Sequence, residues 1–167
     1  MPYFIKPSVN LDPASKRAAY EQATAAIHAN LEGETDTTLK MATINCLLKT
    51  FLPYCYWVGF YVKSGPRRLS VGPYQGTLGC LHIPYDKGVC GRAAREGTTQ
   101  IVADTHALQQ GTDHIACDPN SQSEIVVPVF DSSGQLIAVF DADSTLKHSF
   151  DEADQAYLER LMAAAFG

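Results

Sequence analysis

Ile125-Val-Val-Pro-Val-Phe130, Asp131-Ser-Ser-Gly134 and Leu136-Ile-Ala-Val-Phe140 are the consecutive segments that decide the fold. Two runs rich in β-branched and aromatic residues flank a group of turn formers, a pattern that predicts an antiparallel hairpin. Pro128 has no backbone N–H, so we expect that side of its strand to be unpaired or bulged. The hairpin therefore predicts a sheet that is antiparallel at this point.

A second hairpin is expected earlier in the chain, over residues 55–62 and 69–74, with a turn between them. Side chains alternate along a strand, so Trp57, Gly59 and Tyr61 should share one face. We expect room above the backbone at Gly59, between the two rings. Aromatic residues on a strand are usually core, but a ring on this face could also form the wall of a binding site for a methyl or cationic group. Sequence alone leaves the two alternatives open.

Helical periodicity appears in four places. Asp12 and Pro13 predict the start of a first helix that ends near Gly33, and a second helix begins at about Asp36. We expect Cys46, beside the apolar stripe of the second helix, to be a small buried residue. A short helix is expected over residues 87–95.

The last helix should begin with a capping box formed by Ser149 and Glu152. A short strand is expected over 99–103, and the segment 104–123 should be a long loop of the kind that often covers a binding site. The elements do not alternate strictly between strand and helix. They predict an α+β fold, a mostly antiparallel central sheet of about five or six strands with helices packed against it, in a single domain spanning residues 1–167, with 1–10 as an extended lead-in.

Composition narrows the class of protein. The 167 residues are 46% hydrophobic and 19% charged, with a formal net charge of -5, which disfavours nucleic acid or an anionic membrane as the main partner. The N-terminus lacks the features of a signal peptide, and no apolar run is long enough for a membrane span. We therefore expect a cytoplasmic protein, in which cysteines are kept reduced and are more often catalytic, redox-active or metal-binding than structural.

Three of the five cysteines, Cys80, Cys90 and Cys117, lie in one stretch beside glycines or polar residues. We interpret them as working thiols on loops, where a thiolate is both stabilised and accessible. They show no CxxC spacing, so a zinc site that combines them with His82, His106 or His114 ranks below a redox role. Three unrelated buried thiols are the third alternative.

Three acidic residues should meet at one end of the C-terminal hairpin. Alternation places Asp141 and Asp143 on one face, and Glu124 precedes the opposite strand. Such a group relieves its repulsion by binding a cation or by sharing protons. A solvated sheet end and a ligand-binding site are equally compatible with the sequence.

Several motifs together resemble a known family: Gly72-Pro-Tyr-Gln-Gly76 followed by Cys80, then Gly88-Val-Cys-Gly91, His114-Ile-Ala-Cys-Asp118 and Ser121-Gln-Ser-Glu-Ile-Val-Val-Pro128. They look like the free methionine-(R)-sulfoxide reductases, enzymes built on a GAF domain, and the likeness covers nearly the whole chain. The resemblance implies that Cys117 is the nucleophile, Cys80 the resolving thiol and Cys90 a second redox-active thiol.

The resemblance also assigns the pocket. It implies that Trp57, Tyr61, Glu124, Asp141 and Asp143 hold the substrate, and either Glu124 or Asp143 could supply a proton to the sulfoxide oxygen. No cofactor and no metal are expected.

The implied activity is thiol-dependent reduction of free L-methionine-(R)-sulfoxide through a sulfenic acid and an intramolecular disulfide, with thioredoxin or a similar dithiol as reductant and a homodimer as the assembly. The alternative is a non-catalytic GAF domain that senses a small ligand or redox state. The segment from Asp104 to His114 is a few residues longer than the family pattern, which concerns the shape of the covering loop.

Overall fold

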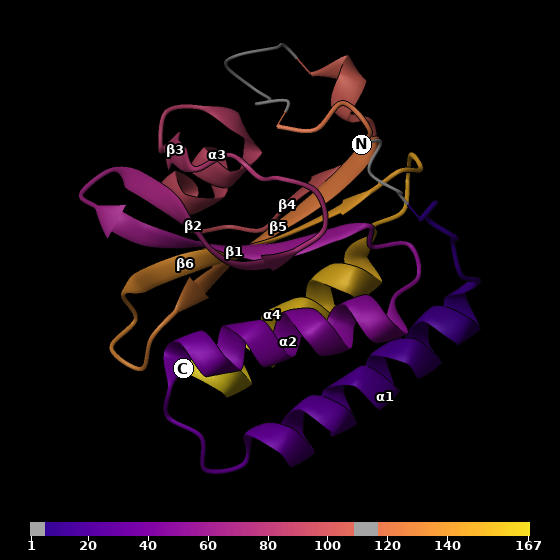
Figure 1. Ribbon diagram of the computed structural model, residues 1–167, viewed down its shortest axis with the longest axis horizontal. Helices are drawn as coiled ribbons and strands as arrows, with labels where there is room; N and C mark the ends of the chain where they lie inside the picture. Colours follow the sequence, from indigo (N-terminus) through magenta and orange to yellow (C-terminus); the bar gives the residue numbers. More distant parts are fainter. Residues whose placement is uncertain (1–5, 109–116) are drawn as a thin grey trace.

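A six-stranded antiparallel sheet in the order β3-β2-β1-β6-β5-β4 forms the centre of the protein (Figure 1). The structure, a computed structural model, describes residues 6–108 and 117–167. The strands are β1 (Trp57–Gly65), β2 (Arg68–Gln75), β3 (His82–Pro84), β4 (Gln100–Val102), β5 (Ser123–Phe130) and β6 (Leu136–Ser144). The helices are α1 (Pro13–Leu31), α2 (Thr37–Phe51), α3 (Gly88–Glu96) and α4 (Glu152–Phe166), with a 3₁₀ turn η1 (Thr105–Ala107).

Both predicted hairpins are present. β5 pairs with β6 and β1 with β2, and the antiparallel β1–β6 pair joins the two hairpins at the middle of the sheet. β4 begins at Gln100, opposite Val126, so within the described residues no strand pairs with Pro128 on the β4 side. The expected α+β class with five or six strands is confirmed. The short strand β3 and the turn η1 were not predicted.

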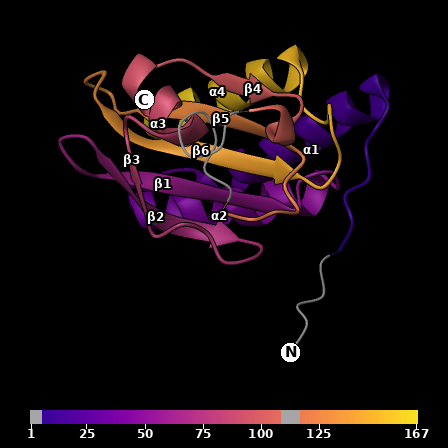
Figure 2. The same ribbon diagram turned by 90° about the horizontal axis from the view of Figure 1, so that it is seen from above.

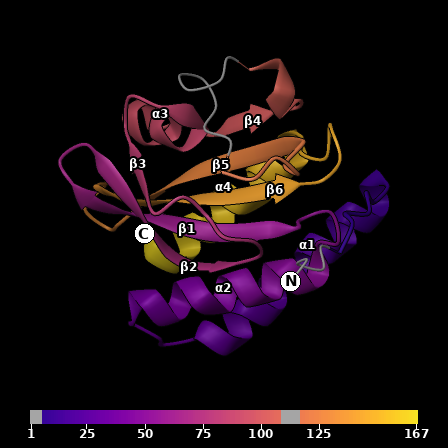
Figure 3. The same cartoon turned by 45° about the horizontal axis from the view of Figure 1, so that its top comes forward.

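The two faces of the sheet have different covers. One face packs against α2 and α4 through a core that includes Ile44, Phe60, Phe140 and Leu158, and α1 packs on these two helices. The other face packs against α3 through a smaller cluster that contains Trp57. Seen from above, α3 lies in front of the sheet and the long helices lie behind it (Figure 2). The tilted view shows the same arrangement, with α3 across the sheet from α2 (Figure 3).

Helix starts follow the sequence signals with one correction. Asp12 caps α1 by accepting a hydrogen bond from the Ser15 backbone N–H at 2.9 Å, as predicted. The capping box of α4 is formed by Asp151 and Asp154, so the predicted box of Ser149 and Glu152 is wrong by two residues. An aspartate can cap as well as a serine, and the Ser149 hydroxyl is used instead in hydrogen bonds to Asn10 and Ser144.

Cys46 is exposed, and its predicted burial is wrong. It lies on α2 between the buried residues Asn45 and Leu48, and its side chain falls on the solvent side of the helix. Small size and apolar character made it compatible with either side of the stripe.

A buried polar cluster joins the first and last helices. The Lys16 ammonium lies 2.6 Å from a carboxylate oxygen of Asp154, which is fully buried. The hydroxyls of Tyr20 and Tyr54 donate to the other oxygen at 2.7 and 2.6 Å. Because these partners satisfy the charge, Asp154 can stay inside an otherwise apolar layer.

Membrane insertion through a helix finds no support in the described residues, since none of their helices combines the length and apolar character that a bilayer span requires.

Candidate active site

A pocket lies on the α3 face of the sheet, where β1, β5 and β6 meet α3 and two loops. Strand residues form its floor, and residues 77–79 and 117–121 form its rim. The lining residues are Tyr56, Trp57, Tyr61, Thr77, Leu78, Gly79, Ile83, Gly88, Val89, Cys90, Cys117, Asp118, Ser121, Glu124, Asp141 and Asp143.

Aromatic rings form one wall of the pocket. Trp57 and Tyr61 follow each other on the same face of β1, and their rings stack with centroids 5.8 Å apart. The Trp57 indole N–H donates to the Thr77 carbonyl at 2.9 Å, which attaches the rim loop to the wall. The expected room above Gly59 is absent, because a Cβ there would lie 2.5 Å from the Trp57 ring. The indole itself occupies that space, and glycine is the residue that permits it.

Three carboxyl groups lie together opposite the rings. Glu124 on β5 is the register partner of Asp143 on β6, and Asp141 points to the same face from two residues earlier. The carboxyl groups of Glu124 and Asp141 are hydrogen-bonded to each other. The predicted meeting of the acids is confirmed, but Glu124 and Asp141 are only 6% and 5% exposed, so this is not a solvated sheet end.

Burial and nearby negative charges make these carboxyl groups weaker acids than ordinary aspartate and glutamate side chains. Burial, followed by the charge of Asp143, raises the pKa of both Glu124 and Asp141 well above the ordinary values. Asp143 retains partial exposure and accepts a hydrogen bond from the Ser121 hydroxyl, and burial raises its pKa to about 7. The pocket can therefore hold protonated carboxyl groups at neutral pH.

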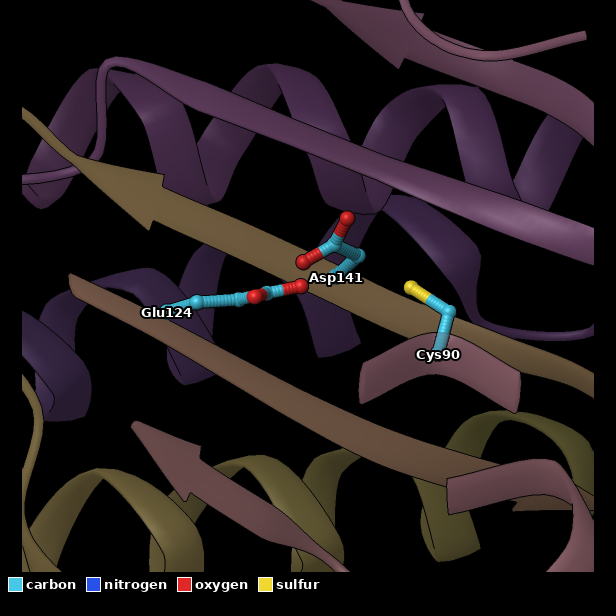
Figure 4. Close-up of side chains that lie close together, drawn as sticks. All are labelled: Cys90, Glu124 and Asp141. Atoms are coloured by element: carbon cyan, nitrogen blue, oxygen red, sulfur yellow. The ribbon is translucent and has the colours of Figure 1, made fainter. Parts of the chain in front are cut away.

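Cys90 lies in the first turn of α3, so the predicted helix over 87–95 is confirmed and the grouping of Cys90 with loop thiols is wrong. Its sulfur and one carboxyl oxygen each from Glu124 and Asp141 lie within 4.8 Å of one another (Figure 4). It is 4% exposed, and burial, followed by the charges of these two acids, raises the pKa of its thiol well above the ordinary value. The glycine-flanked sequence concealed this burial. Gly91 is required because a Cβ there would meet the Pro84 carbonyl oxygen at 2.6 Å.

Cys80 and Cys117 are joined by a disulfide, with their Cα atoms 5.5 Å apart. Cys117 is exposed at the rim, and Cys80 is half-buried. Beside them, the Thr77 hydroxyl donates to the Asp118 carboxylate at 2.5 Å. Burial alone would raise the pKa of Asp118, but the hydrogen bonds from Thr77 and from the Asn120 backbone outweigh it and lower that pKa. The rim thus carries a carboxylate that favours its ionised form, next to a disulfide bond.

The described residues of the alternative zinc site do not come together as one set of ligands. Cys80 and Cys117 offer no thiolate while they are disulfide-bonded. His82 is hydrogen-bonded to Ser70 and His106 to Gln122, and His114 lies outside the described residues, as does much of the long segment 104–123. Within residues 6–108 and 117–167, the potential ligands that do come together are Cys90, Glu124 and Asp141, a different set from the predicted one.

Sequence reasoning did not single out several lining residues. Asp118 and Ser121 belong to motifs that carried the resemblance, so their nearness to Cys117 and Glu124 was a usable signal. Val89 had the same signal through its motif neighbour Cys90, whereas Thr77 and Ile83 had none, because their part in the pocket depends on how the rim loop and β3 lie over the sheet.

Comparison with known proteins accounts for this arrangement. A family model described as "GAF domain" matches residues 41–165. The free methionine-R-sulfoxide reductase of Escherichia coli is 36% identical over 149 residues, which cover 89% of this chain and 87% of that protein. The chain belongs to the GAF-domain family of free methionine-R-sulfoxide reductases.

Solved structures of this reductase family agree over almost the full length. The free methionine-R-sulfoxide reductase of Neisseria meningitidis, in complex with its substrate, superposes with a TM-score of 0.83 at 36% identity and covers 97% of this chain and 93% of its own. The reduced form of the Staphylococcus aureus enzyme gives a TM-score of 0.81 at 38% identity, with 88% and 92% covered. The expected GAF fold is therefore confirmed.

Proposed function

We propose that this protein reduces free L-methionine-(R)-sulfoxide to L-methionine. The observation that carries the proposal is the Cys80–Cys117 disulfide at the rim of a pocket that has an indole wall and a carboxyl-lined floor. The family membership supports the same activity, since relatives named for it are similar over nearly the whole chain.

The disulfide corresponds to the state of the enzyme after it has reduced the sulfoxide and been oxidised itself. In the reduced enzyme, the Cys117 thiolate attacks the sulfoxide sulfur, and the S–O bond breaks as the oxygen takes a proton. The released hydroxide then attacks the Cys117 sulfur, the bond between Cys117 and the substrate sulfur breaks, methionine leaves, and Cys117 becomes a sulfenic acid. The Cys80 thiol then attacks that sulfur and releases water, which forms the disulfide that the structure contains. In this scheme Cys117 is the nucleophile and Cys80 the resolving thiol.

The carboxyl groups divide the remaining work. Burial raises the pKa of Glu124 and of Asp141 well above the ordinary values, so both hold a proton at neutral pH. These two groups are the proton donors to the sulfoxide oxygen. Asp143 and Asp118 lie nearer the rim and face the ammonium group of the amino acid. A methionine sulfoxide inside a polypeptide lacks that ammonium, so these carboxylates select the free amino acid. Trp57 and Tyr61 enclose the methyl end.

Cys90 has a smaller part in this proposal than the resemblance implies. Its thiol is buried against Asp141, and its raised pKa disfavours the thiolate that attack requires. A second redox role for Cys90 stays a prediction. So do the cytoplasmic location and the homodimer.

The test is turnover with the two epimers of methionine sulfoxide, each as the free amino acid and within a peptide. We expect methionine from the free R epimer, with thioredoxin, thioredoxin reductase and NADPH or with dithiothreitol. Cys117→Ser should abolish turnover, whereas Cys46→Ser, a change at an exposed cysteine on α2, should leave it intact. Wild-type turnover by the Cys117 variant would refute the assignment. Absence of turnover with every reductant would favour the sensor alternative.

A further inference from the structure

Two leucines on the rim loop are exposed to an unusual degree. Leu78 is 74% and Leu81 63% exposed, the highest values among the large hydrophobic residues of the described chain, and Val9 follows at 56%. A single exposed apolar side chain needs no explanation. Here two lie within four residues, on either side of Cys80 in the sequence, so exposed apolar side chains flank one end of the disulfide.

The loop that carries the patch is attached at both ends. The carbonyl of Thr77, just before Leu78, accepts the Trp57 indole N–H at 2.9 Å. The carbonyl of Leu81 accepts the Val71 backbone N–H at 3.0 Å, which joins it to β2. These bonds hold the backbone in place while the leucine side chains face solvent. The exposure therefore belongs to a defined surface of the oxidised protein.

Reduction of the Cys80–Cys117 disulfide requires a second molecule that supplies electrons. A partner thiolate attacks one of its two sulfurs, a mixed disulfide forms, and the Cys80–Cys117 bond breaks. The released thiolate takes a proton, the partner's second thiol displaces the mixed bond, and the partner leaves as a disulfide. Two electrons and two protons pass to the enzyme. A protein that does this must cover the residues beside Cys80, because its own sulfur comes within bonding distance.

We propose that Leu78 and Leu81 are the docking surface for a protein dithiol reductant of the thioredoxin class. This rests on the proposed function, since only a recycled disulfide needs such a partner. Redox partners meet through small interfaces, in which a few central apolar contacts provide most of the affinity. The two leucines flank Cys80 in the chain, and most of the surface of each is exposed to solvent.

Leu81→Asp tests the proposal without altering the pocket lining, to which Leu78 belongs but Leu81 does not. Turnover is measured at saturating free methionine-(R)-sulfoxide with increasing thioredoxin, and separately with dithiothreitol. We expect the KM for thioredoxin to rise about tenfold or more, from loss of one buried leucine contact and addition of a charge. The KM for the sulfoxide and the rate with dithiothreitol should not change.

Leu39→Asp is the matched control, because Leu39 is 44% exposed on α2, behind the other face of the sheet. Leu81→Ser repeats the test with a milder change. An unchanged KM for thioredoxin in both Leu81 variants would overturn the docking surface, and so would an equal loss with dithiothreitol. Failure of the proposed function looks different: the wild-type protein would then release no methionine with either reductant.

Discussion

Replacing Asp143 by Asn should stabilise the folded protein, and the gain should grow as the pH rises. Asn keeps the oxygen that accepts the Ser121 hydroxyl hydrogen bond, so the main change is loss of a titratable group. Burial raises the pKa of Asp143 from its ordinary 3.8 to about 7. The folded protein therefore retains this proton at a pH where the unfolded chain has lost it, and the proton's contribution to stability is lost between about pH 4 and pH 7.

The size of the effect follows from the shift. One pKa unit corresponds to about 1.4 kcal/mol, so complete ionisation of Asp143 lowers the free energy of unfolding by about 4 kcal/mol. Most of that loss falls between pH 5 and pH 8. Because Asp143 keeps some exposure to solvent, we expect the advantage of the Asn variant to widen by about 2 kcal/mol over this interval. Urea unfolding of the oxidised protein at the two pH values measures it.

Asp118→Asn should change the stability in the opposite direction to Asp143→Asn, although both residues line the same pocket. Hydrogen bonds lower the pKa of Asp118, so its ionised form stabilises the folded state above the unfolded pKa, and that stability is lost as the pH falls. Its Asn variant should therefore be less stable than wild type at pH 8. If the Asp143 variant and the wild type instead change in parallel between pH 5 and pH 8, the pocket does not raise the pKa of Asp143, and the reasoning is refuted.

Three further changes test the site. Cys80→Ser should release about one methionine per enzyme without further thioredoxin-linked turnover, which a single-turnover assay measures; full turnover would give the resolving role to another thiol. Glu124→Gln should lower kcat by about 10²-fold or more through loss of a proton donor, and a kcat near wild type would exclude that role. Gly59→Ala places a Cβ 2.5 Å from the Trp57 ring and should cost about 1–3 kcal/mol of stability and raise the KM for the sulfoxide; unchanged unfolding and KM would show that the ring can move freely.

The sheet could be predicted because its strands carry strong local signals. The hairpin around Gly134 and the aromatic run that contains Trp57 read correctly from alternation and turn chemistry. Strand β3 is three residues long and contains Pro84, so it has no period to detect. Its pairing with β2 is a tertiary effect that propensity does not encode.

The sequence predicted which residues form the site better than it predicted how deeply they are buried. Register brings Glu124 opposite Asp143, and alternation alone was enough to place the acids together. Burial could not be inferred, since it depends on α3 lying over the sheet. For the same reason Cys90 was grouped with accessible loop thiols, although it lies buried in the helix predicted over 87–95. The space over Gly59 was predicted to be open, although the Trp57 ring fills it.

The cluster around Asp154 defines where the folding unit begins. The family match starts at residue 41, yet Lys16 and Tyr20 on α1 supply two of the groups that neutralise and solvate this carboxylate. A chain shortened to the matched region would retain the buried charge and lose its cation, a defect that typically costs about 3–5 kcal/mol. That is a large part of the net stability of an ordinary domain. The minimal autonomous unit therefore includes helix α1, which lies before the start of the matched GAF model.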